Sequence, residues 1–310
     1  MKTIVDSFNI LLVAFNVAKT QAIRDKGSFT DDDVGLYYHK VFDSIIAFSR
    51  EYGQLIFAEE GRGSLDWRRS IFPDYKANRK KDESYQIFKD HLRDVEEIIS
   101  YFPTKSISVN GAEADDVMYA LATYFADNGE EVLVISGDRD MAQLINYSDK
   151  IRVYSPTLRM FREKQPNLIL EKSIVGDPSD NIPGIPRVGI KTFEKALHDR
   201  NIWNTKIQPN IDIVQKFMQI VDLSKAPAHL KEEAIIQYNM KEFNELDPQG
   251  IESFMFDHAL NEHLSRWPND LGDINMALYK NSVAETTDKK VIEETKIEDV
   301  ESMLDFINNL

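Results

Sequence analysis

The sequence predicts an α/β fold, with a mostly parallel central sheet flanked by helices and a helical C-terminal part. Short apolar runs typical of buried strands alternate with helical patterns up to about residue 168, as expected of a parallel sheet. Two of these runs, at 107–109 and 132–135, flank a helical pattern at 114–127 and so predict a β-α-β unit. From residue 169 onward, turn chemistry lies between helical patterns instead.

The other elements are expected in this order along the chain. A strand at 2–5 ends at Asp6, and a partly helical stretch follows it to residue 24. Three aspartates at 31–33 mark a helix start, and the helix continues to residue 50. The remaining elements are a strand at 54–58 that ends at Glu59 and Glu60, a loop rich in bases and aromatics, an amphipathic helix at about 84–101, a strand at 151–154, and helices at 211–221, 228–238 and 251–264.

Composition excludes several classes of protein. The 310 residues contain no cysteine, which excludes disulfides and thiolate zinc sites and favours a reducing cytosol. No apolar run is long enough to span a membrane, and Asp6 and Asn9 interrupt the apolar start, so we expect neither a membrane span nor a signal peptide. The net charge of −15 argues against nucleic-acid binding. Much of that charge lies in the last 29 residues and in the carboxylates described next, so a local basic path is allowed.

Five carboxylates follow the two strands of the β-α-β unit in two tight groups. Glu113, Asp115 and Asp116 form the first group, and Asp138 and Asp140 form the second. The carboxyl ends of parallel strands share one edge of a sheet, where ligands bind. Carboxylates this close repel one another unless a cation lies among them, so we predict a hard-metal site. The alternative is that Glu113 or Asp115 only caps the helix that follows.

Four further carboxylates are expected at the same edge. Asp6 and Glu60 end the first two strands, and Asp177 and Asp180 lie three residues apart in GDPSD. The predicted metal ligands are Asp6, Glu60, Glu113, Asp115, Asp116, Asp138, Asp140, Asp177 and Asp180. Nine carboxylates suit two Mg²⁺ or Mn²⁺ ions, and the scarcity of histidine disfavours zinc.

The loop after the second strand interleaves aromatic and basic side chains. Its members are Trp67, Arg68, Arg69, Tyr75, Lys76, Arg79, Lys80 and Lys81. This mixture suits binding of a single strand or a junction, through stacking and phosphate contacts. The alternative is a solvated basic loop.

Together, EADD (113–116), SGDRD (136–140) and GDPSDNIPGIPRVGIKT (176–192) resemble the 5′-nuclease superfamily, which includes flap endonucleases and the 5′-nuclease domains of bacterial DNA polymerase I. WRRSIFPDYKANRKK (67–81), the chain length and the C-terminal helical part are most similar to the ribonuclease H of T-even bacteriophages. The resemblance covers about residues 1–265. It implies a metal-dependent α/β nuclease core at 1–168 with an arch at about 61–100, a helical duplex-binding part at 169–281, and an acidic flexible tail at 282–310.

The resemblance also assigns roles to residues. Eight of the nine carboxylates fall on family positions, with Asp140, Asp177 and Asp180 on the second-metal side. Glu60 stands where the family normally has aspartate, and Glu59 and Asp66 compete for its role. The implied catalytic residues are Lys76, Arg68, Asp138 and Asp116, and the two bases would offset charge on the scissile phosphate. The implied nucleic-acid contacts are Arg68, Arg69, Tyr75, Lys76, Arg79, Gly184, Gly189 and Lys191.

Residues 184–192, GIPRVGIKT, resemble the hairpin of a helix-three-turn-helix motif, whose alternative is an ordinary turn between helices. Gly184 and Gly189 are expected to let the backbone turn tightly. Backbone N–H groups at the start of the next helix would then hold a duplex phosphate, Lys191 would add charge, and carbonyl groups would bind K⁺.

The implied function is a 5′-to-3′ exonuclease and flap endonuclease with ribonuclease H activity, which removes RNA primers and adjacent DNA during replication. Its substrates would be RNA–DNA hybrids, 5′ flaps and nicked duplexes. The alternatives are a ribonuclease of the PIN type and a catalytically weak junction-binding protein. We further expect a monomer in the cytoplasm, that of a bacterial host if the protein is phage-encoded, with no membrane partner. A single-strand-binding protein would be a partner, and residues 302–307 resemble peptides that dock on a sliding clamp, unless they only fold back on the body.

Overall fold

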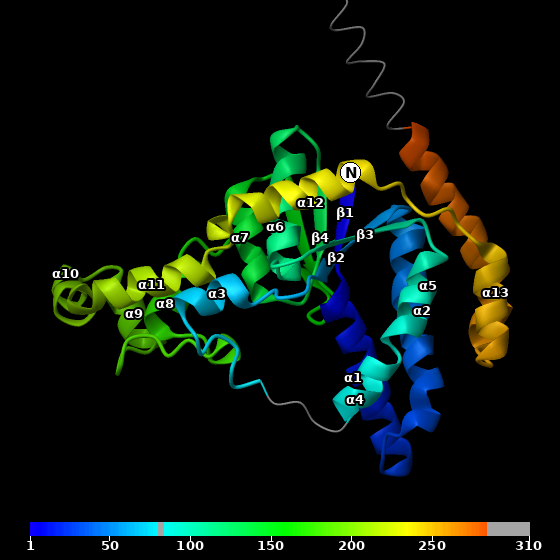
Figure 1. Cartoon of the computed structure of the whole chain (residues 1–310), viewed down its shortest axis with the longest axis horizontal. Coiled ribbons are helices and arrows are strands. Elements are labelled where there is room, and N and C mark those ends of the chain that lie inside the picture. The colour runs from blue at the N-terminus through cyan, green and yellow to red at the C-terminus, as the bar shows by residue number, and fades with distance from the viewer. Residues whose placement is uncertain (80–83, 284–310) are drawn as a thin grey trace, which may run out of the picture.

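The computed structural model describes residues 1–79 and 84–283, and its centre is a six-stranded sheet (Figure 1). The strand order is β3-β2-β1-β4-β5-β6. The strands are β1 (Lys2–Asp6), β2 (Leu55–Glu60), β3 (Thr104–Val109), β4 (Val132–Ile135), β5 (Ile151–Ser155) and β6 (Met160–Phe161). All neighbours pair in parallel except β5 and β6, which are antiparallel. This sheet confirms the predicted fold class.

Alternate residues of β1, β2 and β4 serve two separate cores, because successive side chains point to opposite faces. Val5 belongs to one core and Ile4 to the other. The first core packs against α1 (Ser7–Lys26), α2 (Val34–Tyr52), α5 (Leu92–Ser100) and α13 (Pro248–Asp257). The second packs against α6 (Ala114–Asp127), α7 (Ala142–Tyr147) and α12 (Ala228–Met240). The sheet is thus covered on both faces, and ligands have access at its edge.

A third group of helices projects from the sheet, at the left of Figure 1. It contains α8 (Leu168–Val175), α9 (Ile190–Ala196), α10 (Arg200–Ile202) and α11 (Ile211–Val221), which share their own apolar cluster. In contrast, α12 and α13 return to pack on the sheet, although both follow residue 169. The division of the chain at residue 168 stays a prediction.

Several expected elements differ in detail. The helix expected at 84–101 is two helices, α4 (Ser84–Asp90) and α5, and the break falls at His91. The basic loop contains a short helix, α3 (Asp66–Ile71), and β6 was not expected. The helix expected at 251–264 ends at Asp257 as α13, and a further helix occupies 261–283. The other short turns are η1 (Asp31–Asp33), η2 (Arg139–Met141), η3 (Pro178–Asp180), the π-helical η4 (Trp203–Ile207), η5 (Gln208–Asn210) and η6 (Leu223–Lys225).

Two expectations fall outside the described residues. These are the contribution of Lys80 and Lys81 to the basic loop, and the acidic tail from residue 284 onward with its clamp-docking segment at 302–307. Across residues 1–79 and 84–283, no helix has both the length and the apolar character needed to cross a membrane.

Candidate active site

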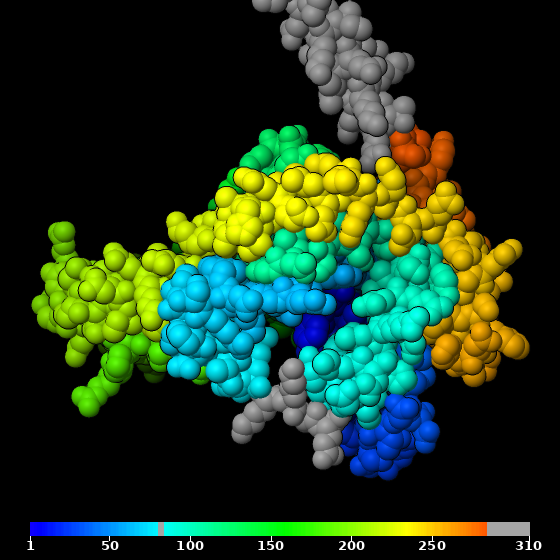
Figure 2. Space-filling model, in the orientation of Figure 1, coloured from blue at the N-terminus to red at the C-terminus, as the bar shows by residue number. Residues whose placement is uncertain are grey.

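A pocket of about 750 Å³ opens at the carboxyl edge of the sheet. Figure 2 shows it as a hollow between the segment around α3 and the region of α4, with N-terminal residues in dark blue at its floor. Its acidic lining consists of Asp6, Glu60, Glu113, Asp115 and Asp138. These side chains come from the ends of β1 and β2, the start of α6, and the turn after β4, so the structure brings together five of the nine predicted carboxylates.

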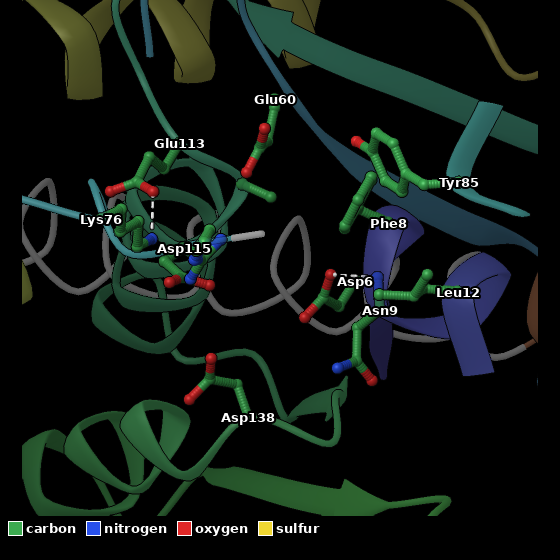
Figure 3. Close-up of a pocket in the computed structure, with 12 residues that line it drawn as sticks. Asp6, Phe8, Asn9, Leu12, Glu60, Lys76, Tyr85, Glu113, Asp115 and Asp138 are labelled. Carbon is green, nitrogen blue, oxygen red and sulfur yellow. Dashed lines mark hydrogen bonds and ion pairs between the residues drawn. The ribbon is translucent and has the colours of Figure 1, made fainter. Parts of the chain in front are cut away.

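Asp6 is held in the pocket by two hydrogen bonds, of which Figure 3 shows the one with Asn9. It caps α1 by accepting a bond from the Asn9 backbone N–H at 3.0 Å, and it accepts a second from the Ser136 hydroxyl at 2.6 Å. The same hydroxyl oxygen accepts the Asp138 backbone N–H at 3.0 Å. Burial, followed by the negative charges of Asp138 and Glu60, raises the pKa of Asp6 to about 6 despite these bonds.

Asp115 and Glu60 also line the pocket. Burial and the charge of Asp138 raise the pKa of Asp115 well above its usual range. Of the three candidates near the end of β2, only Glu60 lines this pocket. Glu59 points to the other face of the strand, and burial raises its pKa although a hydrogen bond with Ser106 opposes the shift.

A second acidic group contains Asp140, Asp177 and Asp180, whose carboxylate oxygens lie within 4.8 Å of one another. The group combines the turn after β4 with η3, as predicted for the second-metal side. Burial raises the pKa of Asp140 to about 6, and burial likewise raises that of Asp180. Burial opposes ionisation of Asp177 too, but the Lys172 ammonium and Ser179 hold its pKa below the usual value.

Sequence reasoning missed Lys172, which lies in this second group. Its ammonium is 2.7 Å from Asp177 and also contacts Asp140. The side chain is almost fully buried, and burial alone would lower its pKa, but the two carboxylates raise it instead. Lys172 thus supplies a positive charge among the carboxylates. The only signal in the sequence was a lysine on the helix that precedes GDPSD.

Arg68 is buried in ion pairs and does not line the pocket. It is 1% exposed, and its guanidinium binds both oxygens of Asp116, at 2.9 and 2.7 Å, and Glu113 at 2.7 Å. Asp116 is therefore turned away from the pocket and paired with Arg68, so neither residue lines it. The two charges neutralise each other in a buried, bidentate pair, and a phosphate contact by Arg68 and metal binding by Asp116 stay predictions.

The rest of the basic loop divides into buried and exposed members. Tyr75 is 3% exposed and donates its hydroxyl to Glu113 at 3.0 Å, so its ring is not available for the expected base stacking. Lys76 lines the pocket and its ammonium contacts Glu113. Arg79 lines the pocket as well, is exposed, and lies 3.2 Å from Asp180. Arg69 is exposed and donates to the Tyr75 carbonyl at 3.1 Å.

The two glycines of the expected hairpin differ in what they do. Gly184 has φ +65°, and a Cβ there would lie 2.4 Å from backbone atoms of Val175 and Gly176, so the turn requires glycine. Gly189 has φ −98° and open space around it, so the expectation that it enables the turn is wrong. Arg187 adopts a positive φ of 65° instead. Lys191 is exposed on α9, and none of these residues lines the pocket.

A separate group of metal-ligating side chains, His39, Asp43 and His263, lies between α2 and the helix at 261–283. Both ring nitrogens of His263 are engaged, with the His39 carbonyl at 3.1 Å and with Arg266 at 3.0 Å. Lys40 binds Asp43 at 3.0 Å. Two of the three residues are histidines, whereas hard cations prefer oxygen donors, as in the group of Asp140, Asp177 and Asp180.

Comparison with known proteins points the same way. The family model of the 5′-3′ exonuclease N-terminal resolvase-like domain matches residues 2–174. A 5′-3′ exonuclease from Buchnera aphidicola (subspecies Schizaphis graminum) is 34% identical over 168 residues, which cover 48% of this chain and 54% of that protein. A DNA polymerase I from Caldicellulosiruptor bescii is 31% identical over 53% of this chain and 20% of its own length. The chain therefore spans about half of the first relative and about a fifth of the second.

Two crystal structures of a bacteriophage T5 protein share the fold. One, co-crystallised with metal ions, has a TM-score of 0.53 at 18% identity and covers 83% of this chain and 98% of its own. The other, a flap endonuclease in a complex with DNA and metal ions, has a TM-score of 0.51 at 20% identity and covers 83% of this chain and 97% of its own. At these identities the likeness shows the fold alone.

Proposed function

Because this chain belongs to the family of 5′-3′ exonucleases with an N-terminal resolvase-like domain, we propose that it is a metal-dependent 5′ nuclease. It would hydrolyse phosphodiester bonds near the 5′ ends of nucleic-acid strands, in flaps and at nicks. The observation that carries this proposal is the convergence of five carboxylates on one pocket together with Lys76 and Arg79. Carboxylates alone would repel a phosphate, whereas hard divalent cations among them would attract it.

Each group of residues in the site would have its own role. Asp6, Glu60, Glu113, Asp115 and Asp138 would hold one divalent ion, and Asp140, Asp177 and Asp180 would hold a second. When bound, such ions activate the attacking water and stabilise the leaving oxygen. Lys76 and Arg79 would bind the phosphate and offset negative charge on its oxygens. Arg68 would act indirectly, by fixing Glu113 at the pocket wall.

Finer features of the function are also proposals. Mg²⁺ is the natural ion for a site of oxygen donors, and Mn²⁺ would substitute for it. We further propose ribonuclease H activity and a role in removing RNA primers during replication, in accord with relatives named 5′-3′ exonuclease and DNA polymerase I. Exposed Lys191 and the turn at Gly184 support a duplex grip at α9. Binding of K⁺ there, docking on a clamp, and a monomeric state stay predictions.

The test is the substitution Asp138→Asn, with Asp149→Asn as a matched control. Asp138 lines the pocket, whereas Asp149 is an exposed residue that pairs with Lys164. We expect Asp138→Asn to reduce Mg²⁺-dependent cleavage of a labelled 5′ flap and of a labelled RNA–DNA hybrid by at least about 100-fold, as loss of a main electrostatic group does. Asp149→Asn should cleave normally. Near-normal cleavage by Asp138→Asn would reject the site.

One alternative has an observation in its favour. Lys76 and Lys172 already neutralise carboxylates of both groups, so metal binding would have to compete with two internal ammonium groups. A catalytically weak protein that binds junctions would follow from that competition. Tight binding of flap DNA with no cleavage in either Mg²⁺ or Mn²⁺ would favour it over the nuclease.

A further inference from the structure

Two helices carry candidate metal ligands outside the pocket. His39 and Asp43 lie one turn apart on the same face of α2, and His263 lies on the helix at 261–283. One nitrogen of each histidine and one oxygen of Asp43 lie within 4.8 Å of one another. None of the three residues lines the pocket, so the proposed nuclease function does not account for their meeting.

The distances between these donor atoms suit a tetrahedral ion. Asp43 Oδ2 lies 3.3 Å from Nδ1 of His39, and Asp43 Oδ1 lies 3.5 Å from Nε2 of His263. In tetrahedral zinc sites, bonds of about 2.0–2.1 Å place neighbouring donor atoms about 3.4 Å apart. The carboxylate therefore lies at the spacing of a zinc ligand from both imidazoles.

The hydrogen bonds of His39 leave one of its ring nitrogens available to an ion. Nε2 lies 3.2 Å from the Glu262 carboxylate, so Nε2 carries the ring proton and donates it. Nδ1 is then unprotonated, and it is buried with no hydrogen-bond partner among the described residues. Its lone pair faces the negative charge of Asp43, an arrangement that a cation between the two would stabilise. A carboxylate behind a metal-binding histidine is also how proteins usually orient such a ring.

His263 is in the protonation state that binds metal, although two side-chain cations lie nearby. It is fully buried, and burial together with the neighbouring His39 lowers its pKa, so the ring is neutral at neutral pH. Lys40 lies 3.0 Å from Asp43, and Arg266 lies 3.0 Å from Nδ1 of His263. Both of these side chains reach solvent and can move aside for an ion. The ring proton of His263 then moves from Nε2 to Nδ1, which leaves Nε2 as the ligand.

We propose that His39, Asp43 and His263 form a binding site for a borderline divalent ion such as Zn²⁺, Co²⁺ or Ni²⁺. Two imidazoles and one carboxylate suit these ions better than Mg²⁺, which prefers oxygen donors. The ion joins α2, which packs on the sheet, to the helix at 261–283, and a water molecule completes its coordination. Its role is structural and does not depend on the nuclease function.

The test measures binding of Co²⁺ by visible absorption, with excess Mg²⁺ present to compete for the carboxylate pocket. Tetrahedral Co²⁺ with nitrogen ligands absorbs far more strongly than octahedral Co²⁺ bound to oxygen atoms, so the spectrum separates the two sites. Asp43→Asn and His39→Ala each remove one ligand, and both side chains are partly exposed. His229→Ala is the matched control, because His229 is exposed on α12, and Asp138→Asn reports on the pocket.

We expect strong tetrahedral bands in the unchanged protein, in His229→Ala and in Asp138→Asn. A change behind a metal ligand costs about 10–100-fold in affinity, so Glu262→Gln should weaken Co²⁺ binding about tenfold, and loss of a ligand in Asp43→Asn or His39→Ala should weaken it at least about 100-fold. Bands that are absent from the unchanged protein, that survive in both ligand variants, or that disappear in Asp138→Asn overturn the proposal. Cleavage is not measured, so failure of the nuclease function would leave this result unaffected.

Discussion

The carboxylate of Asp6 destabilises the metal-free protein, and its replacement should show by how much. Asp6 is buried, and burial together with the charges of Asp138 and Glu60 raises its pKa from 3.8 to about 6. At neutral pH, the difference between these two pKa values corresponds to about 3 kcal/mol of lost folding free energy. The site therefore holds a charge that the fold alone does not favour.

The substitution Asp6→Asn removes that charge with little change in shape. The amide oxygen can still accept the backbone N–H of Asn9, but the amide NH₂ cannot accept the Ser136 hydroxyl as the carboxylate does. Loss of that hydrogen bond costs about 1 kcal/mol. We expect the variant to be more stable than the unchanged protein by about 2 kcal/mol at neutral pH without metal.

The stability that Asp6→Asn gains over the unchanged protein must depend on pH in a defined direction. Because the pKa of Asp6 is higher in the folded state, the folded protein binds the proton more tightly. The penalty is thus absent below the unfolded pKa of 3.8 and is complete once the pH exceeds about 6. Urea unfolding in EDTA should show the full gain of Asp6→Asn near pH 7.5, and the gain should shrink steadily as the pH falls toward about 4.

Divalent ions should make the unchanged protein more stable than the Asp6→Asn variant. A cation that binds only the folded state stabilises the unchanged protein, and Asp6→Asn should gain less from Mn²⁺ because it has lost one ligand. The control Asp149→Asn should respond to pH and to Mn²⁺ as the unchanged protein does, since Asp149 is exposed and pairs with Lys164. A gain that is the same at every pH, or a less stable Asp6→Asn variant in EDTA near pH 7.5, would refute the reasoning.

Two other predictions concern the turn after α8 and the lysine among the carboxylates. Gly184→Ala should lower the free energy of unfolding by more than about 1 kcal/mol, because the φ of Gly184 is +65° and a Cβ there would lie 2.4 Å from backbone atoms. Gly189→Ala should change the free energy of unfolding by less than about 0.5 kcal/mol. Equal urea midpoints for the two variants would contradict this prediction. Lys172→Met should destabilise the metal-free protein by about 3 kcal/mol, since Asp140 and Asp177 lose their buried partner. The same variant should bind Mn²⁺ more tightly than the unchanged protein in calorimetry. Weaker Mn²⁺ binding would show that Lys172 does not compete with the ion.

The parts of the fold with strong local signals were predictable from the sequence. The helix at 114–127 and the strand at 132–135 agree with α6 and β4 at both ends. Their apolar periodicity is clear, and Glu113 and Asp116 cap the helix start by reciprocal hydrogen bonds. Parallel pairing then places the ends of β1, β2 and β4 at one edge. The convergence of carboxylates on that edge follows from these facts alone.

The direction of each side chain was not predictable in the same way. Asp115 and Asp116 are adjacent in the chain, yet Asp115 lines the pocket and Asp116 pairs with Arg68. Arg68 lies 48 residues away in sequence, so no local pattern could show this pair. Lys172 presents the same difficulty, because its partners Asp140 and Asp177 meet it only in the folded chain. Such pairs depend on tertiary packing, which a local pattern does not contain.

The loop with Lys76 is held to the turn with Asp180 by one backbone hydrogen bond and by two bonds from side-chain amides to backbone carbonyls. The Lys76 backbone N–H donates to the Asp180 carbonyl at 3.0 Å, and the Asn78 side-chain amide donates to the Pro178 carbonyl at 2.7 Å. The Asn181 side-chain amide donates in the opposite direction, to the Asp74 carbonyl at 2.7 Å. Two segments about 100 residues apart in sequence are thus tied together, so we expect the Lys76 backbone N–H to exchange with solvent only when both segments separate. The position of Lys76 in the pocket is in this way coupled to the position of Asp180 in the second acidic group.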